Sequence, residues 1–191
     1  MIICLCGRSN SGKGTIAKTF TCLDNSIIHL DIDRIAHHVN DKEEVKEKLV
    51  DTFGTQVLNK GKISRKKLGS IVFNDKDEMK KLETITWKYM EKEIDSYISD
   101  NKEKIIILDY IMLPRTKYFK TSDLRILVKA PYEERLKRAI IRDNITKELF
   151  DQRDGAAINY VDEDFDYVID NGKGDVKRKV AKIYEQSVIS R

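Results

Sequence analysis

The chain has 191 residues, too few for two ordinary domains but enough to bury one self-sufficient apolar core. Its 36 Lys and Arg residues nearly balance 32 Asp and Glu residues, and the net charge of +4 falls short of the concentrated basic face of a nucleic-acid-binding protein. No apolar run approaches the length of a membrane span, and the amino terminus reads as a strand rather than as a basic, apolar leader. We therefore expect a cytoplasmic protein that acts on small anionic molecules, without nucleic-acid or membrane partners.

Short apolar runs alternate along the chain with longer polar stretches of helical pattern. This alternation is typical of an α/β fold in which helices cover a parallel sheet. The five predicted strands are Ile2–Cys6, Ile27–Leu30, Ile105–Leu108, Leu124–Lys129 and Tyr167–Ile169. Cys4, Cys6 and Cys22 form neither an even disulfide framework nor a metal quartet, so we expect three reduced thiols in the core.

Two segments are expected to lie outside the sheet core. The mostly helical stretch between the second and third strands, about 37–103, is too long for one crossover helix and predicts an inserted substrate-binding subdomain. The stretch at about 136–163 interrupts the return to the last strand and predicts a lid. The remaining segments, 1–36, 104–135 and 164–191, would form the core of a single domain.

The stretch "GRSNSGKGT", residues 7–15, follows the first strand and matches the GxxxxGK pattern of a phosphate-binding P-loop. In such a loop, main-chain amides and a helix amino terminus surround a polyphosphate, and the lysine reaches its outer phosphates. The alternative is a glycine-rich turn that binds nothing, which the strand before and the helix after make less favourable. The predicted nucleotide-binding residues of the loop are Gly7, Asn10, Ser11, Gly12, Lys13, Gly14 and Thr15.

The residue after Lys13 is Gly14, where the strict motif has a Ser or Thr that ligates magnesium. Thr15 follows one place later and is the candidate metal ligand, which leaves open the oxygen that holds the ion. Because the ending GKGT occurs in loops like those of adenylate kinases, it favours a small-molecule kinase over a GTPase or a motor. A GTPase is disfavoured further because "NKEK", residues 101–104, lacks the Asp of the guanine-reading NKxD segment.

Carboxylates follow two of the predicted strands. Asp31 and Asp33 stand at the end of the second strand, where open parallel sheets place ligand-binding groups. One of them could accept a proton from an attacking hydroxyl or orient magnesium, although either could instead cap the following helix. Asp109 ends the third strand and could hold magnesium through water, or could simply terminate the strand.

Arginines are frequent from residue 135 onward, several of them at helical spacing: Arg135, Arg138, Arg142 and Arg153. Mobile guanidinium groups can neutralise charge that develops during phosphoryl transfer and can exclude water as a lid closes. The alternative for each is a solvated helix face paired with nearby acids such as Glu133, Glu134 or Asp143. The three histidines lack the spacing of a metal triad, and we assign them no chemistry.

Together these segments resemble the dephospho-coenzyme A kinase family over most of the chain. The resemblance is carried by the P-loop, "LDIDRIAHHV", "FGTQVLNKGKISRKKLGSIVFND", "KKLE", "RLKRAIIRD" and "DYVIDNGK". It implies a P-loop kinase core with a helical acceptor-binding region and a lid. It also implies transfer of the terminal phosphoryl group of ATP, with Mg²⁺, to the ribose 3'-hydroxyl of dephospho-coenzyme A, in a monomer or weak homo-oligomer.

The resemblance also implies roles for individual residues. Asp33 matches the carboxylate that activates the hydroxyl, and Lys13 matches the phosphate-binding lysine. Arg142 and Arg153 match lid arginines, and Arg142 joins Lys13 and Asp33 as a candidate catalytic residue. Arg138, from the arginine-rich stretch, is a further candidate ATP-binding residue. Asn171 and Gly172 lie where the purine would rest, and Thr15 and Asp109 are the candidate magnesium ligands.

Two sites depart from the family pattern, and both lie toward the acceptor. Thr86 and Trp87 stand in place of a customary His-Pro pair. The stretch "DYIMLPRTKYF" places Pro114 and Arg115 where the family has a proline, two leucines, an aromatic residue and a glutamate. Two alternatives therefore stay open: a related nucleotide or nucleoside kinase with another acceptor, and a non-catalytic ATP-binding module.

Overall fold

The computed structural model describes residues 1–73, 75–172 and 174–189. Asn74 and Lys173, which fall in two of the segments that carry the family resemblance, lie outside the described residues. The chain forms two compact units, one made of Met1–Asp31 with Asn101–Arg191 and the other of Ile32–Asp100. No helix in the described ranges is long and apolar enough to cross a membrane.

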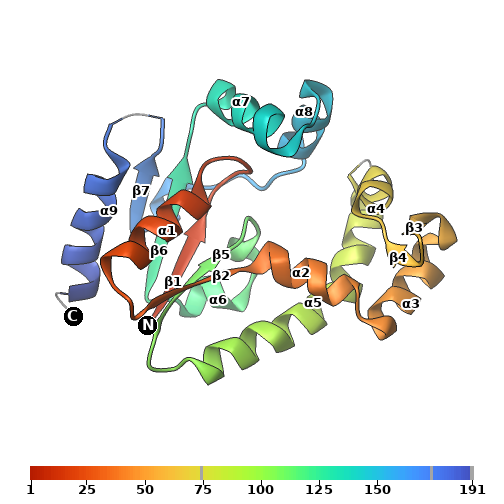
Figure 1. The fold of residues 1–191 in the computed structure, drawn as a ribbon, viewed down its shortest axis with the longest axis horizontal. Helices are drawn as coiled ribbons and strands as arrows, with labels where there is room; N and C mark the ends of the chain where they lie inside the picture. The colour runs from red at the N-terminus through yellow and green to blue at the C-terminus, as the bar shows by residue number, and fades with distance from the viewer. Residues whose placement is uncertain (74, 173, 190–191) are drawn as a thin grey trace. The chain divides into compact units, whose positions relative to one another are not determined.

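The first unit is built on a five-stranded parallel sheet with the order β2-β5-β1-β6-β7 (Figure 1). All five predicted strands are confirmed, and three of them run one residue further, each ending in an Asp. The strands are β1 (Ile2–Cys6), β2 (Ile27–Asp31), β5 (Ile105–Asp109), β6 (Leu124–Lys129) and β7 (Tyr167–Asp170). Since Leu5 pairs with both Asp109 and Ile126, the carboxyl ends of the three central strands meet at one edge.

Helices and short turns connect these strands. The helices of this unit are α1 (Lys13–Leu23), α6 (Lys117–Thr121), α7 (Tyr132–Asp143), α8 (Lys147–Gly155) and α9 (Val176–Tyr184). Single turns occur at Leu113–Arg115 and Asp162–Asp164, and a π-helical turn at Glu185–Ile189 follows α9. The predicted lid stretch therefore contains most of α7 and the whole of α8.

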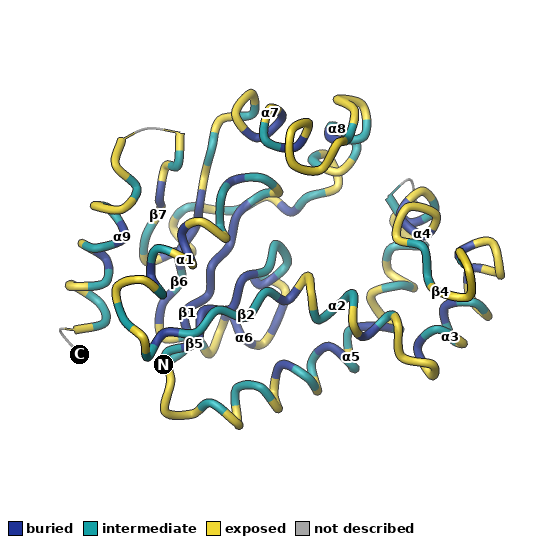
Figure 2. The backbone as a smooth tube through the Cα atoms, in the orientation of Figure 1, coloured by how far each residue is buried: buried dark blue, intermediate teal, exposed yellow. Residues whose placement is uncertain are grey.

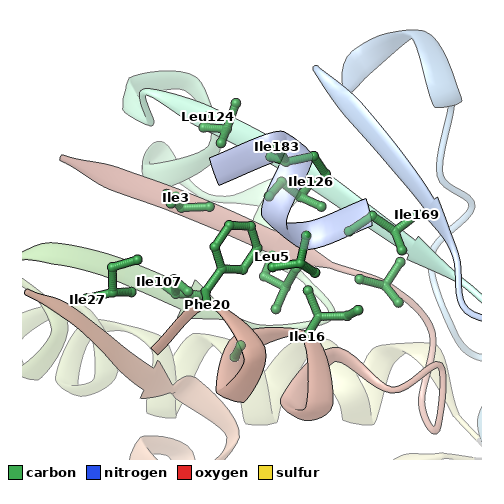
Figure 3. Close-up of a cluster of buried hydrophobic side chains, with 13 residues drawn as sticks. Ile3, Leu5, Ile16, Phe20, Ile27, Ile107, Leu124, Ile126, Ile169 and Ile183 are labelled. Atoms are coloured by element: carbon green, nitrogen blue, oxygen red, sulfur yellow. The ribbon is translucent and has the colours of Figure 1, made fainter. Parts of the chain in front are cut away.

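The apolar core of this unit lies between the sheet and the helices α1 and α9 (Figure 3). Ile16, Ala17 and Phe20 of α1 are fully buried, a spacing that keeps one face of the helix against the strands. They pack with Leu5 of β1 and Ile183 of α9, among others. Figure 2 shows the buried backbone following the central strands. A rigid sheet edge thus supports the loop that follows β1.

The cysteine prediction is only partly confirmed. Cys4 and Cys6 are buried on β1, but Cys22 is exposed on α1, so its assignment to the core is wrong. The reason is helical geometry, because Cys22 lies two residues after the buried Phe20 and so points away from the face that packs on the sheet.

The second unit is mainly helical, with α2 (Ile32–Asn40), α3 (Glu43–Phe53), α4 (Arg65–Val72) and the long α5 (Lys76–Asp100). The helices α2, α3 and α4 pack on α5. Lys48 of α3 donates to the hydroxyl of Tyr89 on α5 at 2.6 Å. A short antiparallel hairpin, β3 (Leu58–Asn59) with β4 (Lys62–Ile63), interrupts the expected helical pattern, and its turn has positive φ at Lys60 and Gly61.

Candidate nucleotide-binding site

The loop between β1 and α1 has the backbone geometry of an anion-binding nest. Gly7, Asn10 and Gly12 have φ of 151°, 62° and 96°, in the region that favours glycine. A Cβ on Gly7 would lie 2.4 Å from the carbonyl oxygen of Val128, and one on Gly12 would lie 2.0 Å from Nδ2 of Asn171. Both glycines are therefore required by close approach as well as by φ. A backbone of this kind, next to the positive end of a helix such as α1, is suited to binding an anion through main-chain amides.

Lys13, the first residue of α1, contacts both the start of this loop and the end of β5. Its Nζ donates to the carbonyl oxygen of Gly7 at 3.1 Å and lies 3.7 Å from Oδ1 of Asp109. Both side chains are nearly buried, with 11% of Lys13 and 10% of Asp109 exposed. A buried ammonium beside a loop of this kind is suited to the outer phosphates of a nucleotide.

Asp109 has a second side-chain neighbour, an imidazole, that sequence reasoning missed. Nε2 of His29, on β2, lies 3.3 Å from Oδ2 of Asp109. The two residues share a face of the sheet, since His29 lies two residues before Asp31, which pairs with Asp109. The sequence did show that His29 and Asp31, two residues apart on one strand, lie on the same face of the sheet. It did not show which strand would pair with theirs, and so could not place Asp109 beside His29.

The residues around Lys13 fit a magnesium site of the kind found with nucleotides. Mg²⁺ is commonly bound by one or two carboxylates together with substrate phosphates and water. Asp109 offers a nearly buried carboxylate, and Thr15 lies exposed in the first turn of α1. Within the described ranges, no three His, Cys, Asp or Glu side chains group as an independent metal site. The donor set therefore suits an ion that arrives with a polyphosphate.

Two predicted residues from distant parts of the chain fasten the loop from outside. Nδ2 of Asn171, after β7, donates to the carbonyl oxygen of Ser11 at 2.7 Å. NH1 of Arg138, on α7, donates to the carbonyl oxygens of Asn10 and Ser11 at 3.3 Å. These bonds use carbonyl oxygens of the loop as acceptors and so fix its backbone, while the amides of Ser11 and Thr15 donate within the loop to the carbonyl oxygens of Arg8 and Gly12. Gly172 adjoins them, and a Cβ there would lie 2.4 Å from Cδ of Pro131.

The two predicted lid arginines lie further from the loop. Arg142 lies in the last turn of α7 with 69% of its side chain exposed, and its Nε donates to the carboxylate of Asp143 at 2.7 Å. This bond lowers the pKa of Asp143. The same carboxylate accepts from Nδ2 of Asn10 at 3.4 Å, which links Arg142 to the loop through one residue. Arg153 is exposed on α8.

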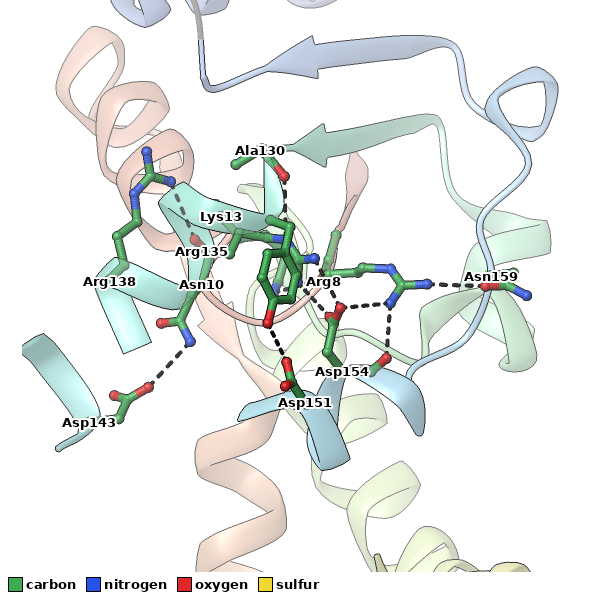
Figure 4. Close-up of polar contacts among 12 residues, drawn as sticks. Arg8, Asn10, Lys13, Ala130, Arg135, Arg138, Asp143, Asp151, Asp154 and Asn159 are labelled. Carbon is green, nitrogen blue, oxygen red and sulfur yellow. Dashed lines mark hydrogen bonds and ion pairs between the residues drawn. The ribbon is translucent and has the colours of Figure 1, made fainter. Parts of the chain in front are cut away.

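A further polar cluster beside the loop was not predicted as a unit. Asp154 of α8 contacts both Arg8 of the loop and Arg135 of α7 (Figure 4). The alternative of a solvated helix face does not hold for Arg135, because its side chain is only 7% exposed and it binds Asp154. The sequence holds no local signal for these contacts, since Arg8 and Asp154 are 146 residues apart.

A cavity of about 420 Å³ adjoins this cluster, and its lining residues are Arg8, Ser11, Leu127, Val128, Lys129, Ala130, Arg135, Asn159 and Tyr160. Ser11 is 1% exposed, and its Oγ has no hydrogen-bond partner among the described residues. The Tyr160 hydroxyl donates to the carbonyl oxygen of Ile111 at 2.7 Å, and burial raises its pKa. The cavity thus lies between the loop and β6, with both polar and apolar side chains in its lining.

The remaining predicted residues lie at the end of β2, in the helical unit and in the turn after β5. Asp31 ends β2, and Asp33 lies in the first turn of α2, which belongs to the helical unit. The role of Asp33 therefore stays a prediction. In the same unit, Thr86 is buried on α5, and its hydroxyl donates to the carbonyl oxygen of Leu82 at 2.9 Å. Arg115 is exposed in the turn after β5.

Comparison with known proteins gives a consistent result. The sequence model of the family described as dephospho-CoA kinase matches residues 1–175. The dephospho-CoA kinase of Aquifex aeolicus is 36% identical over 189 residues, which cover 95% of each chain.

Two solved structures share the fold. TT1252 from Thermus thermophilus has a TM-score of 0.78 at 24% identity and covers 95% of this chain and 94% of its own. A dephospho-CoA kinase from Campylobacter jejuni has a TM-score of 0.60 at 23% identity and covers 97% and 96%.

Proposed function

Because the chain belongs to the dephospho-CoA kinase family, we propose that it transfers the terminal phosphoryl group of ATP to the ribose 3'-hydroxyl of dephospho-coenzyme A. This reaction is the last step of coenzyme A synthesis. The observation that carries the proposal is the nest of amides between Gly7 and Thr15, with the nearly buried ammonium of Lys13 at its mouth. Phosphoryl transfer depends mainly on positioning and on charge stabilisation, which is what this arrangement supplies.

The residues around the loop have distinct proposed roles in ATP binding. The amides and Lys13 would hold the outer phosphates, whereas Arg138, Asn171 and Gly172 would border the purine end. Asp109, through water, and Thr15 would hold Mg²⁺. When bound, Mg²⁺ neutralises charge on the outer phosphates. Support comes from the 3.7 Å separation of Lys13 and Asp109 and from the bonds of Arg138 and Asn171 to the loop.

Transfer itself requires a base and a way to stabilise moving charge. Asp33 would take the proton of the acceptor hydroxyl as its oxygen bonds to the terminal phosphorus and the bond to the leaving ADP oxygen breaks. Lys13 would neutralise charge on the transferred group, assisted by Arg142 and Arg153 from the lid. The lid would also exclude water and so suppress hydrolysis of ATP.

The helical unit and the lid stretch would have separate roles in handling the two substrates. The helical unit Ile32–Asp100 would bind the acceptor, and the stretch 136–163, with most of α7 and all of α8, would form the lid. We expect the enzyme to act in the cytoplasm as a monomer or weak homo-oligomer, on small molecules rather than on nucleic acid or membranes. The modest net charge of +4 is compatible with two anionic substrates.

Incubation with ATP, Mg²⁺ and dephospho-coenzyme A, followed by mass detection of one added phosphate, tests the proposal. The expected product is coenzyme A together with an equal amount of ADP. A second candidate function, phosphorylation of another nucleoside-like alcohol, is favoured by Thr86 and Trp87 on α5 and by Pro114 and Arg115 after β5, which depart from the family pattern.

A panel of nucleoside monophosphates in the same assay separates the two candidates. Phosphate appearing on a nucleoside monophosphate, and none on dephospho-coenzyme A, would reassign the acceptor. Binding of ATP without transfer to any acceptor would instead indicate a non-catalytic ATP-binding module.

A further inference from the structure

Arg8, the second residue of the phosphate-binding loop, is held by the segment that contains α8. Its NH1 donates to the main-chain oxygen of Asp154 at 2.9 Å and lies 3.2 Å from the carboxylate of the same residue. Its NH2 donates to Oδ1 of Asn159 at 3.1 Å. About a third of the Arg8 side chain, 31%, is exposed. The guanidinium therefore turns away from Lys13 and toward the lid stretch, as Figure 4 shows.

Asp154 is fixed in turn by a second arginine. Arg135 donates from NH1 and NH2 to the two carboxylate oxygens of Asp154, at 2.5 and 3.0 Å, and from Nε to the carbonyl oxygen of Ala130 at 3.3 Å. This fork geometry holds the carboxylate in one orientation. Burial alone would raise the pKa of Asp154, but the hydrogen bonds and charges of Arg135 and Arg8 outweigh it and lower that pKa. Asp154 is thus a carboxylate shared by two guanidinium groups.

The loop needs such external support. Backbone in the left-handed region persists at a residue such as Asn10 only when the surroundings determine it. Arg138 and Asn171 fasten the second half of the loop through the carbonyl oxygens of Asn10 and Ser11. The first half is held at Gly7, whose carbonyl oxygen accepts from Lys13, and at Arg8, whose side chain binds Asp154 and Asn159. Losing the attachment at Arg8 would let the amides of the first half reorient.

We propose that Asp154 is a positioning residue that, by holding Arg8, keeps the first half of the loop in its anion-binding conformation and so sets the affinity for the outer phosphates of the nucleotide. Neither Asp154 nor Arg8 needs to touch the nucleotide for this effect. The inference rests on the proposed binding of ATP by the loop. It means that a residue of the lid stretch, Asp154, affects how tightly the loop binds the outer phosphates of the nucleotide.

Calorimetric titration of the full chain with ATP, ADP and AMP tests the inference. Arg8→Ala removes the loop side of the cluster and leaves the Arg135–Asp154 pair intact. It should weaken ATP and ADP binding on the order of ten- to a hundredfold, the loss expected for a charge-assisted hydrogen bond. AMP binding should change less than about twofold, because AMP lacks the outer phosphates that the loop holds. Asp154→Asn should weaken ATP binding similarly, and the double variant should add little to either single change.

Two controls keep the result specific. Arg125→Ala breaks an Arg–Asp pair with Asp166 near the amino end of β6, away from the loop, and should leave ATP affinity unchanged. Asp154→Glu keeps the carboxylate and should retain most of the affinity. If Asp154→Asn does not fold, as judged by thermal unfolding, Arg8→Ala and Asp154→Glu decide the question.

Three outcomes would overturn the inference: unchanged ATP affinity in Arg8→Ala, an equal loss for AMP, or fully additive losses in the double variant. Since no acceptor is present, failure to phosphorylate dephospho-coenzyme A does not affect these measurements. A wild-type protein that does not bind ATP would overturn the proposed function as well.

Discussion

The Nζ atom of Lys13 lies 3.7 Å from the carboxylate of Asp109, and the two residues reach each other from neighbouring parallel strands. Lys13 follows β1 by way of the loop, whereas Asp109 is the last residue of β5. Because both side chains are about nine-tenths buried, the pair is shielded from salt and water. The arrangement brings an ammonium and a carboxylate together beside the loop.

Replacement of Lys13 by Ala should abolish turnover and weaken ATP binding strongly, because it removes the nearly buried ammonium group beside the loop. ADP release with dephospho-coenzyme A as acceptor, together with ATP titration, measures both effects. Lys18→Ala is the matched control, since Lys18 is an exposed lysine on the same helix. Turnover within tenfold of wild type in Lys13→Ala would contradict the assigned role.

Gly12 and Gly14 should respond in opposite ways to substitution by Ala. At Gly12 the new Cβ would lie 2.0 Å from Nδ2 of Asn171, and φ is 96°, so we expect a loss of about 1–3 kcal/mol in the free energy of unfolding and loss of ATP binding. At Gly14 no atom lies within 4 Å of the new Cβ, and the residue is helical, so stability should rise by up to about 1 kcal/mol. Urea unfolding of both variants measures the difference. Wild-type ATP affinity in Gly12→Ala would show that the loop tolerates the contact.

Asp33→Asn should lower the turnover number by about 10²–10⁴ while sparing ATP binding, because the amide keeps the size of the carboxylate but cannot accept the proton. Steady-state kinetics with saturating ATP and dephospho-coenzyme A, paired with ATP calorimetry, separate the two effects. Asp31→Asn serves as a comparison at the end of β2. Normal turnover in Asp33→Asn would remove the assignment of this residue as the base.

The stability of the protein should fall in alkaline solution because of the thiols of β1. Burial raises the pKa of Cys4 from 9.0 to about 12, although Ser122 and Arg125 offset part of the shift, and burial also raises the pKa of Cys6. The native state therefore keeps a proton that the unfolded chain loses as the pH rises above 9. The stabilisation is present below that pH and is lost between about 9 and 12, at up to about 1.4 kcal/mol per pH unit for each thiol.

Urea unfolding between pH 8 and pH 10.5 tests this prediction. Cys4→Ala should lower stability at pH 8 but reduce the dependence of stability on pH. Cys22→Ser, at an exposed position, should leave the dependence unchanged. An identical pH dependence in Cys4→Ala and wild type would show that the Cys4 thiol does not contribute to it.

Features that depend on local pattern could be predicted from the sequence. The loop was recognisable because strand, glycines, lysine and helix follow one another within fifteen residues, and Asp109 because it ends a continuous apolar run. The five strands were predictable for the same reason. In contrast, the hairpin at Leu58–Ile63 was missed, because its strands have only two residues each and lie inside a stretch of helical pattern.

Contacts between distant segments could not be predicted. Arg135 lies among charged residues at helical spacing, which is typical of a solvated face, and only tertiary packing shows that it is buried against Asp154. His29 likewise reaches Asp109 only because β2 and β5 are neighbours in the sheet, although 80 residues separate them in sequence. Sequence pattern thus located the loop and Asp109, while the contacts of Arg135 and His29 required the tertiary structure.

The exposure of Cys22 has a practical consequence for experiments on this chain. All three cysteines are described, and Cys22 is the one whose thiol is exposed, so a maleimide dye should attach to the folded protein at a single position. That position lies about 13 Å along α1 from Lys13, at 1.5 Å per residue, and so reports from the helix without covering its first turn. Cys4 and Cys6 are buried on β1, so they should react only where the sheet has opened. The amount of dye bound beyond one per molecule would therefore measure the fraction of chains in which the sheet has opened.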